Sequence, residues 1–239
     1  MTQYNNNLKL LLITGVVVVL LFLLTYTGLN KPTALISTTN VENQSKFDVF
    51  DFLKKSSQSD TLIISMLEKL EKDSTNSQLI EKLIQSSKEK NIETVNAFVL
   101  FLKGKSTSNI ETLQQSADKF LNLSTQDSNI ASQLFYSNYG KKACDLILKI
   151  QTKNLAALTR KASFLIYIDN ETMGGVQLLK EVEKIDSNYI EAQHLLMLLA
   201  IQSQQFEKAE KRLKKLISLQ PENSFYKELL IKIETQQLK

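Results

Sequence analysis

Glycine and proline, the residues on which tight turns most depend, are scarce in this sequence. The whole chain of 239 residues holds 6 Gly and 2 Pro. A β-sandwich or a β-barrel needs many tight turns, so this composition argues against both. The chain is rich instead in Lys, Glu, Leu, Gln and Ser, most of which favour helix. The composition therefore predicts an all-α protein.

Cysteine and histidine occur once each, as Cys144 and His194. A single cysteine cannot form an internal disulfide or a cysteine-rich zinc site, and a single histidine leaves one base for any Ser/His/Asp or Cys/His arrangement. The sequence has no Gly-rich phosphate loop, no HExxH and no GxSxG. We expect the Cys144 thiol to be buried and inert, because Leu146 and Ile147 follow it in a helical pattern. The chain is therefore predicted not to be an enzyme and to use no cofactor, no metal and no small-molecule substrate.

One long apolar run lies near the N-terminus. Residues 10–29 lie between Lys9 and Lys31 and carry no charge, and about 20 helical residues cross the roughly 30 Å of a bilayer core. Backbone polar groups in hydrocarbon must be paired within the segment, so the run is predicted to be a transmembrane helix. The rival interpretation is a cleaved signal peptide, whose apolar region normally spans roughly 7–15 residues and ends at a small-x-small site. TYTGLN offers no such site.

Two polar segments flank this run. The short tail, residues 1–9, favours insertion with the N-terminus in the cytoplasm. Lysines lie on both sides of the run, so the positive-inside rule itself gives almost no orientation signal. Residues 30–58 carry many Ser, Thr, Asn and Gln and are interpreted as a juxtamembrane linker. Phe47, Phe50 and Leu53 are spaced for a short amphipathic helix, which either packs on the following domain or lies on the membrane surface.

Apolar residues recur at helical spacing through the rest of the chain, residues 59–239. Ile63, Met66, Leu67 and Leu70 form the first such stripe, and further stripes follow, joined by a few polar residues at a time. Short joints make neighbouring helices antiparallel. The sequence thus predicts a domain of antiparallel helix pairs.

A repeat is present near the C-terminus. Gly175 and Ala209 are 34 residues apart, and the apolar residues after them keep the same offset. A helix-turn-helix unit of this length resembles the tetratricopeptide repeat (TPR). The clearest units are residues 156–189 and 190–223, and residues 224–237 are expected to form the capping helix that a solenoid needs.

The last unit carries the resemblance best. Ala192 provides the small residue early in the first helix, Phe206 the aromatic that opens the second, and Ala209 the small residue that lets the two helices approach closely. Pro221 ends the unit, since proline cannot continue a helix. Gln193 departs from the pattern, because an aromatic residue is common there.

The C-terminal segment also resembles a group of Bacteroidetes membrane-anchored TPR proteins. This resemblance implies an α-solenoid anchored in the bacterial inner membrane, with its N-terminus cytoplasmic and its TPR domain periplasmic. The first functional hypothesis is a scaffold that binds a membrane or envelope protein in an envelope, secretion or quality-control complex; the resemblance itself implies no reaction. The first helices of the pairs would line a concave groove suited to an extended or helical peptide. Six residues are predicted to line this groove: Arg160, Phe164, Tyr167, His194, Leu198 and Gln202. Phe164 and Leu198 serve equally well as packing residues between repeats.

A second functional class remains open, namely an accessory subunit held mainly by its transmembrane helix. Gly15 and the valines that follow it form a candidate face for a multi-pass partner, although no GxxxG is present. The basic run at residues 208–215 is interpreted as a solvated helix face, with an acidic lipid or partner as the alternative. Nucleic acid is not expected as a partner, since the net charge is only +4.

Overall fold

The computed structural model describes residues 48–235, which form one compact unit. The chain forms eleven helices and no strands over the described residues, so the all-α prediction is confirmed there. The helices are α2 (Val49–Ser56), α3 (Thr61–Lys72), α4 (Ser77–Glu89), α5 (Glu93–Thr107), α6 (Ile110–Gln126), α7 (Ile130–Ile150), α8 (Leu155–Tyr167), α9 (Thr172–Ile185), α10 (Ile190–Gln202), α11 (Phe206–Leu219) and α12 (Ser224–Glu234).

Several sequence predictions concern segments outside the described residues. The tail at 1–9, the transmembrane helix at 10–29 and linker residues 30–47 belong to this group. The last residues of the predicted capping helix, 236 and 237, belong to it as well. Within the part that the structure describes, no helix is both long enough and apolar enough to span a bilayer.

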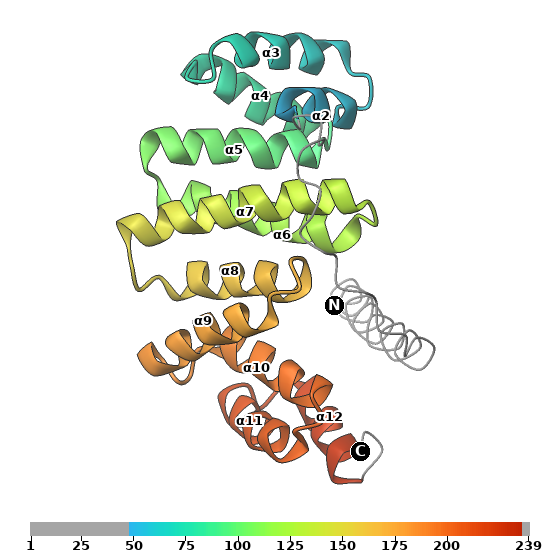
Figure 1. Cartoon of the computed structure of the whole chain (residues 1–239), viewed down its shortest axis with the longest axis vertical. Helices are drawn as coiled ribbons and strands as arrows, with labels where there is room; N and C mark the ends of the chain where they lie inside the picture. The colour runs from blue at the N-terminus through green and yellow to red at the C-terminus, as the bar shows by residue number, and fades with distance from the viewer. Residues whose placement is uncertain (1–47, 236–239) are drawn as a thin grey trace, which may run out of the picture. The chain divides into compact units, whose positions relative to one another are not determined.

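The helices stack in chain order (Figure 1). Each packs against its neighbour in sequence and the joints are short, so consecutive helices run antiparallel, as is typical of an α-solenoid. The buried side chains form three successive clusters rather than one centre: the first spans α2 to α8, the second α8 to α10, and the third α10 to α12. Each cluster depends on adjacent helices, which is how repeat proteins build their core.

Asparagine and aspartate side chains begin seven of the eleven described helices. Each accepts a hydrogen bond from a backbone N–H of the first turn, which otherwise lacks a partner within the helix. These caps are Asp48, Asp60, Asn76, Asn109, Asn129, Asn154 and Asn223. The scattered Asn and Asp residues thus set where most helices start.

Three of the described glycines, Gly104, Gly140 and Gly175, allow close helix packing rather than turns. No described glycine has a positive φ, whereas Asn91, Asn170 and Gln204 adopt the left-handed conformation in joints between helices. Gly140 lies inside α7 directly beneath the ring of Phe164 from α8, and a Cβ at Gly140 would meet that ring at Cε1 at 2.8 Å. Real Cβ atoms essentially never approach another atom this closely, so α7 and α8 approach each other only because Gly140 has no side chain.

Helix α2 begins inside the segment interpreted as a linker, and it packs on the domain. Leu53 is fully buried, and the Phe50 ring meets Phe98 of α5 edge-on at 6.0 Å between centroids. The Phe52 ring lies 4.5 Å from that of Phe135 in α7. Of the two sequence alternatives for this short amphipathic helix, the structure therefore shows packing on the domain.

Candidate functional site

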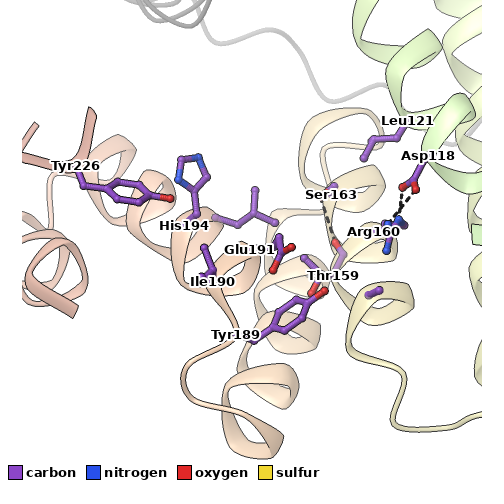
Figure 2. A pocket seen from close by; sticks show the side chains of 12 residues that line it. Asp118, Leu121, Thr159, Arg160, Ser163, Tyr189, Ile190, Glu191, His194 and Tyr226 are labelled. Atoms are coloured by element: carbon purple, nitrogen blue, oxygen red, sulfur yellow. Dashed lines mark hydrogen bonds and ion pairs between the residues drawn. The ribbon is translucent and has the colours of Figure 1, made fainter. Parts of the chain in front are cut away.

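A pocket of about 430 Å³ lies between α8 and α10, and α6 and α12 complete its walls. Its size falls in the range of about 300–1,000 Å³ that is usual for ligand pockets. Figure 2 shows side chains of α8 and α10 facing one another across it, with Asp118 at one end and Tyr226 at the other. The lining residues are Asp118, Leu121, Ala156, Thr159, Arg160, Ser163, Tyr189, Ile190, Glu191, His194, Leu195 and Tyr226.

An ion pair between α8 and α6 closes one end of the pocket. The Arg160 guanidinium donates through Nε to Asp118 Oδ1 and through Nη2 to Asp118 Oδ2, the second bond measuring 2.9 Å (Figure 2). A planar guanidinium held by both carboxylate oxygens has a fixed orientation. Arg160 is therefore already neutralised by Asp118 and is not a free cation for a ligand.

Two residues that line this pocket each carry a buried polar atom without a hydrogen-bond partner. The atoms are Thr159 Oγ1 and His194 Nδ1, both shielded from solvent, and they are the two such side-chain atoms in the described part of the chain. Thr159 is 6% exposed, and Ser163 Oγ donates to the Thr159 backbone carbonyl at 3.1 Å rather than to its hydroxyl. A buried polar group without a partner costs about 1–3 kcal/mol and calls for an explanation. Their shared location marks the pocket as the best candidate binding site.

His194 lies at the α12 side of the pocket, against two aromatic rings. Its ring centroid is 5.7 Å from that of Tyr226 and 6.2 Å from that of Phe225. Burial lowers the pKa of His194, because the surrounding apolar groups disfavour the charged imidazolium. The side chain is therefore neutral near pH 7.

The pocket brings together two of the six residues predicted for the groove, Arg160 and His194. Phe164 is fully buried and fills the space left by Gly140, so it is a packing residue. Leu198 is half-buried against the cluster of α10 to α12. The two others, Tyr167 and Gln202, are the last residues of α8 and α10; both are exposed and neither lines the pocket.

Sequence reasoning missed the remaining polar lining residues. Asp118 is 42 residues from Arg160, and no local pattern connects the two. Tyr226 belongs to the helix interpreted only as a cap, although the 34-residue period aligns it with Ala192 in the first helix of the preceding unit. The 34-residue period was therefore the signal from which a contribution of α12 to the pocket could have been expected. Thr159 carried no such signal, because Arg160, Lys161 and Ser163 are also polar residues of α8.

A buried hydrogen-bond network explains one departure from the TPR pattern. Gln193, 1% exposed, donates to Glu183 Oε1 at 2.9 Å and accepts from Arg212 Nη1 at 2.5 Å. The same guanidinium nitrogen donates to Glu183 Oε1 at 2.7 Å, and this interaction lowers the pKa of Glu183. Gln193 therefore links α9, α10 and α11 where an aromatic residue is common in the family. Arg212 of the basic run is thus a structural residue rather than part of a solvated face.

The lone cysteine, Cys144, is a buried residue of α7. Cys144 is fully buried, and burial raises its pKa to about 12. The expectation that Cys144 is buried is therefore confirmed, and a thiol rather than a thiolate is favoured at neutral pH. No group of three or more His, Cys, Asp or Glu side chains among the described residues is arranged to hold a metal ion.

Comparison with known proteins adds no relative to these observations. No protein-family model matches the chain, and a search of curated proteins finds no match.

Proposed function

We propose that this protein is a membrane-anchored, TPR-like scaffold that binds another protein through the pocket between α8 and α10. The observation that carries the proposal is that this pocket holds the unpaired Thr159 hydroxyl and His194 Nδ1. Because both atoms are shielded from solvent, a partner segment reaches them only if the Thr159 or His194 side chain turns toward the pocket; a polar group seated there then supplies the missing hydrogen bonds. If other groups of the chain already made these hydrogen bonds, the pocket would give no reason to expect a polar ligand.

Four features support the TPR assignment. The second helices α9 and α11 have the same length and begin 34 residues apart, at Thr172 and Phe206. Gly175 and Ala209 occupy equivalent positions in them, and both are buried. Pro221 follows the end of α11, and α12 covers the last cluster of buried side chains.

The membrane anchor in this proposal is the uncharged run at residues 10–29. In the proposed arrangement it spans the bacterial inner membrane with the N-terminus in the cytoplasm and the helical domain in the periplasm. A tether raises the local concentration of the domain near membrane and envelope proteins, so a modest affinity in the pocket suffices for binding. The proposed role requires no catalysis and no cofactor.

Affinity capture from solubilised membranes tests the proposal with a matched pair of variants. Ala156→Phe places a ring in the pocket, whereas Ala131→Phe makes the same change at the same helix position, the second residue of α7, on an exposed site outside it. Phe164→Ala is unsuitable, because removing a buried ring costs about 3–5 kcal/mol and reports stability rather than binding.

The expected result is a partner that is retained by Ala131→Phe and lost with Ala156→Phe. A third variant replaces residues 10–29 by an unrelated apolar helix. If the partner is still captured by Ala156→Phe but is lost when residues 10–29 are replaced, binding through the pocket is contradicted. That result would favour an accessory subunit held through its transmembrane segment.

A further inference from the structure

The pocket contains one acidic side chain that forms no ion pair with the cations of the described residues. Glu191 lies in the first turn of α10, is exposed and lines the pocket, and no ion pair joins it to a described cation. By contrast, the other acidic lining residue, Asp118, is fully engaged by Arg160. Because Asp118 and Arg160 cancel each other, the pocket carries one net negative charge, located at Glu191.

Two tyrosines flank this carboxylate. Tyr189 precedes α10 and Tyr226 comes from α12, and both line the pocket (Figure 2). Burial raises the pKa of each tyrosine, and the nearby charge of Glu191 raises it further. Both rings are therefore neutral at pH 7, and both line the same pocket as the Glu191 carboxylate. The faces of such rings attract cations, and the effect strengthens when the cation is partly desolvated.

The remaining walls suit the stem of a long side chain. Leu121, Ala156, Ile190 and Leu195 supply apolar surface, against which the methylenes of lysine or arginine pack while the charged end reaches a polar group. His194 does not oppose a cation at neutral pH, since burial lowers its pKa and keeps it uncharged.

We propose that the pocket binds a lysine or arginine side chain of the partner protein, with Glu191 as its counter-ion and Tyr189 and Tyr226 as flanking rings. This inference rests on the proposed function, because it assumes that the occupant is a protein segment. It adds the chemistry of the residue recognised: a long side chain with an apolar stem and a cationic end.

Ligand-observed saturation-transfer NMR on the full-length chain in detergent tests the inference. The probes are three end-capped tripeptides, acetyl-Leu-X-Leu-amide, in which X is arginine, citrulline or glutamate. Citrulline keeps the shape of arginine and removes the charge. The protein variants are Glu191→Gln and the matched control Glu207→Gln, which changes an exposed acid at the second position of α11. Unfolding curves of both variants confirm that they are folded.

We expect the arginine peptide to bind about tenfold more tightly than the citrulline peptide, and the glutamate peptide to bind least. Glu191→Gln should abolish this preference, and Glu207→Gln should leave it intact. Equal binding of the arginine and citrulline peptides, an unchanged preference in Glu191→Gln, or no transfer to the arginine peptide would each overturn the inference.

Failure of this test is distinguishable from failure of the proposed function. If the arginine and citrulline peptides bind equally well while Ala156→Phe still abolishes capture of the partner, the pocket binds protein by other chemistry. If Ala156→Phe leaves capture unchanged, the binding role of the pocket itself fails.

Discussion

Two adjacent glycines in α9 allow a sharp test of how the helix pairs are packed. Gly175→Ala and Gly174→Ala make the same chemical change one residue apart in the same helix. A Cβ at Gly174 would lie 3.7 Å from Leu165 Cδ1, an ordinary contact. A Cβ at Gly175 would collide with the Ile166 side chain, coming within 2.8 Å of Cδ1, and would lie 2.9 Å from the backbone oxygen of Ala162.

The magnitudes follow from two opposing terms. Replacing glycine by alanine within a helix stabilises it by about 0.5–1 kcal/mol, because the unfolded chain loses freedom. Overpacking a buried contact costs about 1–3 kcal/mol. Neither collision at Gly175 is easily relieved, since Ile166 is β-branched and stiff and the Ala162 oxygen belongs to the backbone. Gly174→Ala is therefore expected to stabilise the protein, and Gly175→Ala to destabilise it. The helix term cancels in their difference, which leaves about 1–3 kcal/mol of packing cost.

Urea denaturation of the full-length chain, followed by far-UV circular dichroism, measures both variants against the parent protein. A double-mutant cycle adds Ile166→Ala, which removes the colliding atoms and should make Gly175→Ala less costly in that background. The reasoning is refuted if Gly175→Ala raises the free energy of unfolding as much as Gly174→Ala does. In that case α8 and α9 do not approach each other through the small residue at position 175.

Three further outcomes follow from buried polar groups. Burial lowers the pKa of His194 below its ordinary 6.5, so the unfolded state binds a proton at this residue more readily than the folded state does. The free energy of unfolding should therefore fall as pH drops below 6.5. Urea titrations at about pH 7.5 and about pH 5.5 measure this decrease, which His194→Leu should reduce. An equal decrease in the variant would contradict this. Cys144, with its pKa raised to about 12, should not react with a water-soluble disulfide reagent in the native protein and should react fully in urea; rapid native labelling would contradict its burial. Arg212→Met should lower the free energy of unfolding by about 1–3 kcal/mol, because Glu183 and Gln193 lose the guanidinium that donates hydrogen bonds to them. The control Lys211→Met, at an exposed position of the same helix, should change it by less than about 0.5 kcal/mol. Similar losses in the two variants would contradict a structural role for Arg212.

Much of the fold was predictable because its causes are local. Apolar periodicity and the lack of turn residues indicate helices and exclude tight-turned sheets. The 34-residue offset between Gly175 and Ala209 matches the spacing of α9 and α11, and a small buried residue occupies the fourth position of each helix.

The site was less predictable, because its geometry depends on long-range contacts and on exact register. The first helices α8 and α10 begin 35 residues apart, at Leu155 and Ile190, while the second helices keep an offset of 34. One residue of shift turns a side chain by about 100° around its helix. Phe164 and Leu198, which the 34-residue period aligns, therefore do not occupy equivalent positions: Phe164 is fully buried, whereas Leu198 is half-buried. The tight fit of the Phe164 ring over Gly140 likewise joins two helices that no sequence period relates.

Site-specific photo-crosslinking tests the central claim most directly. A photoreactive phenylalanine derivative is placed at Ala156, inside the pocket, and separately at Ala131, the exposed counterpart on α7. The full-length protein is irradiated in intact cells. The account predicts a discrete crosslinked protein adduct from position 156 that is absent from position 131 and is lost when Glu191→Gln is added. Adducts of equal yield and size from the two positions, or none from position 156, would contradict a partner-binding role for the pocket between α8 and α10.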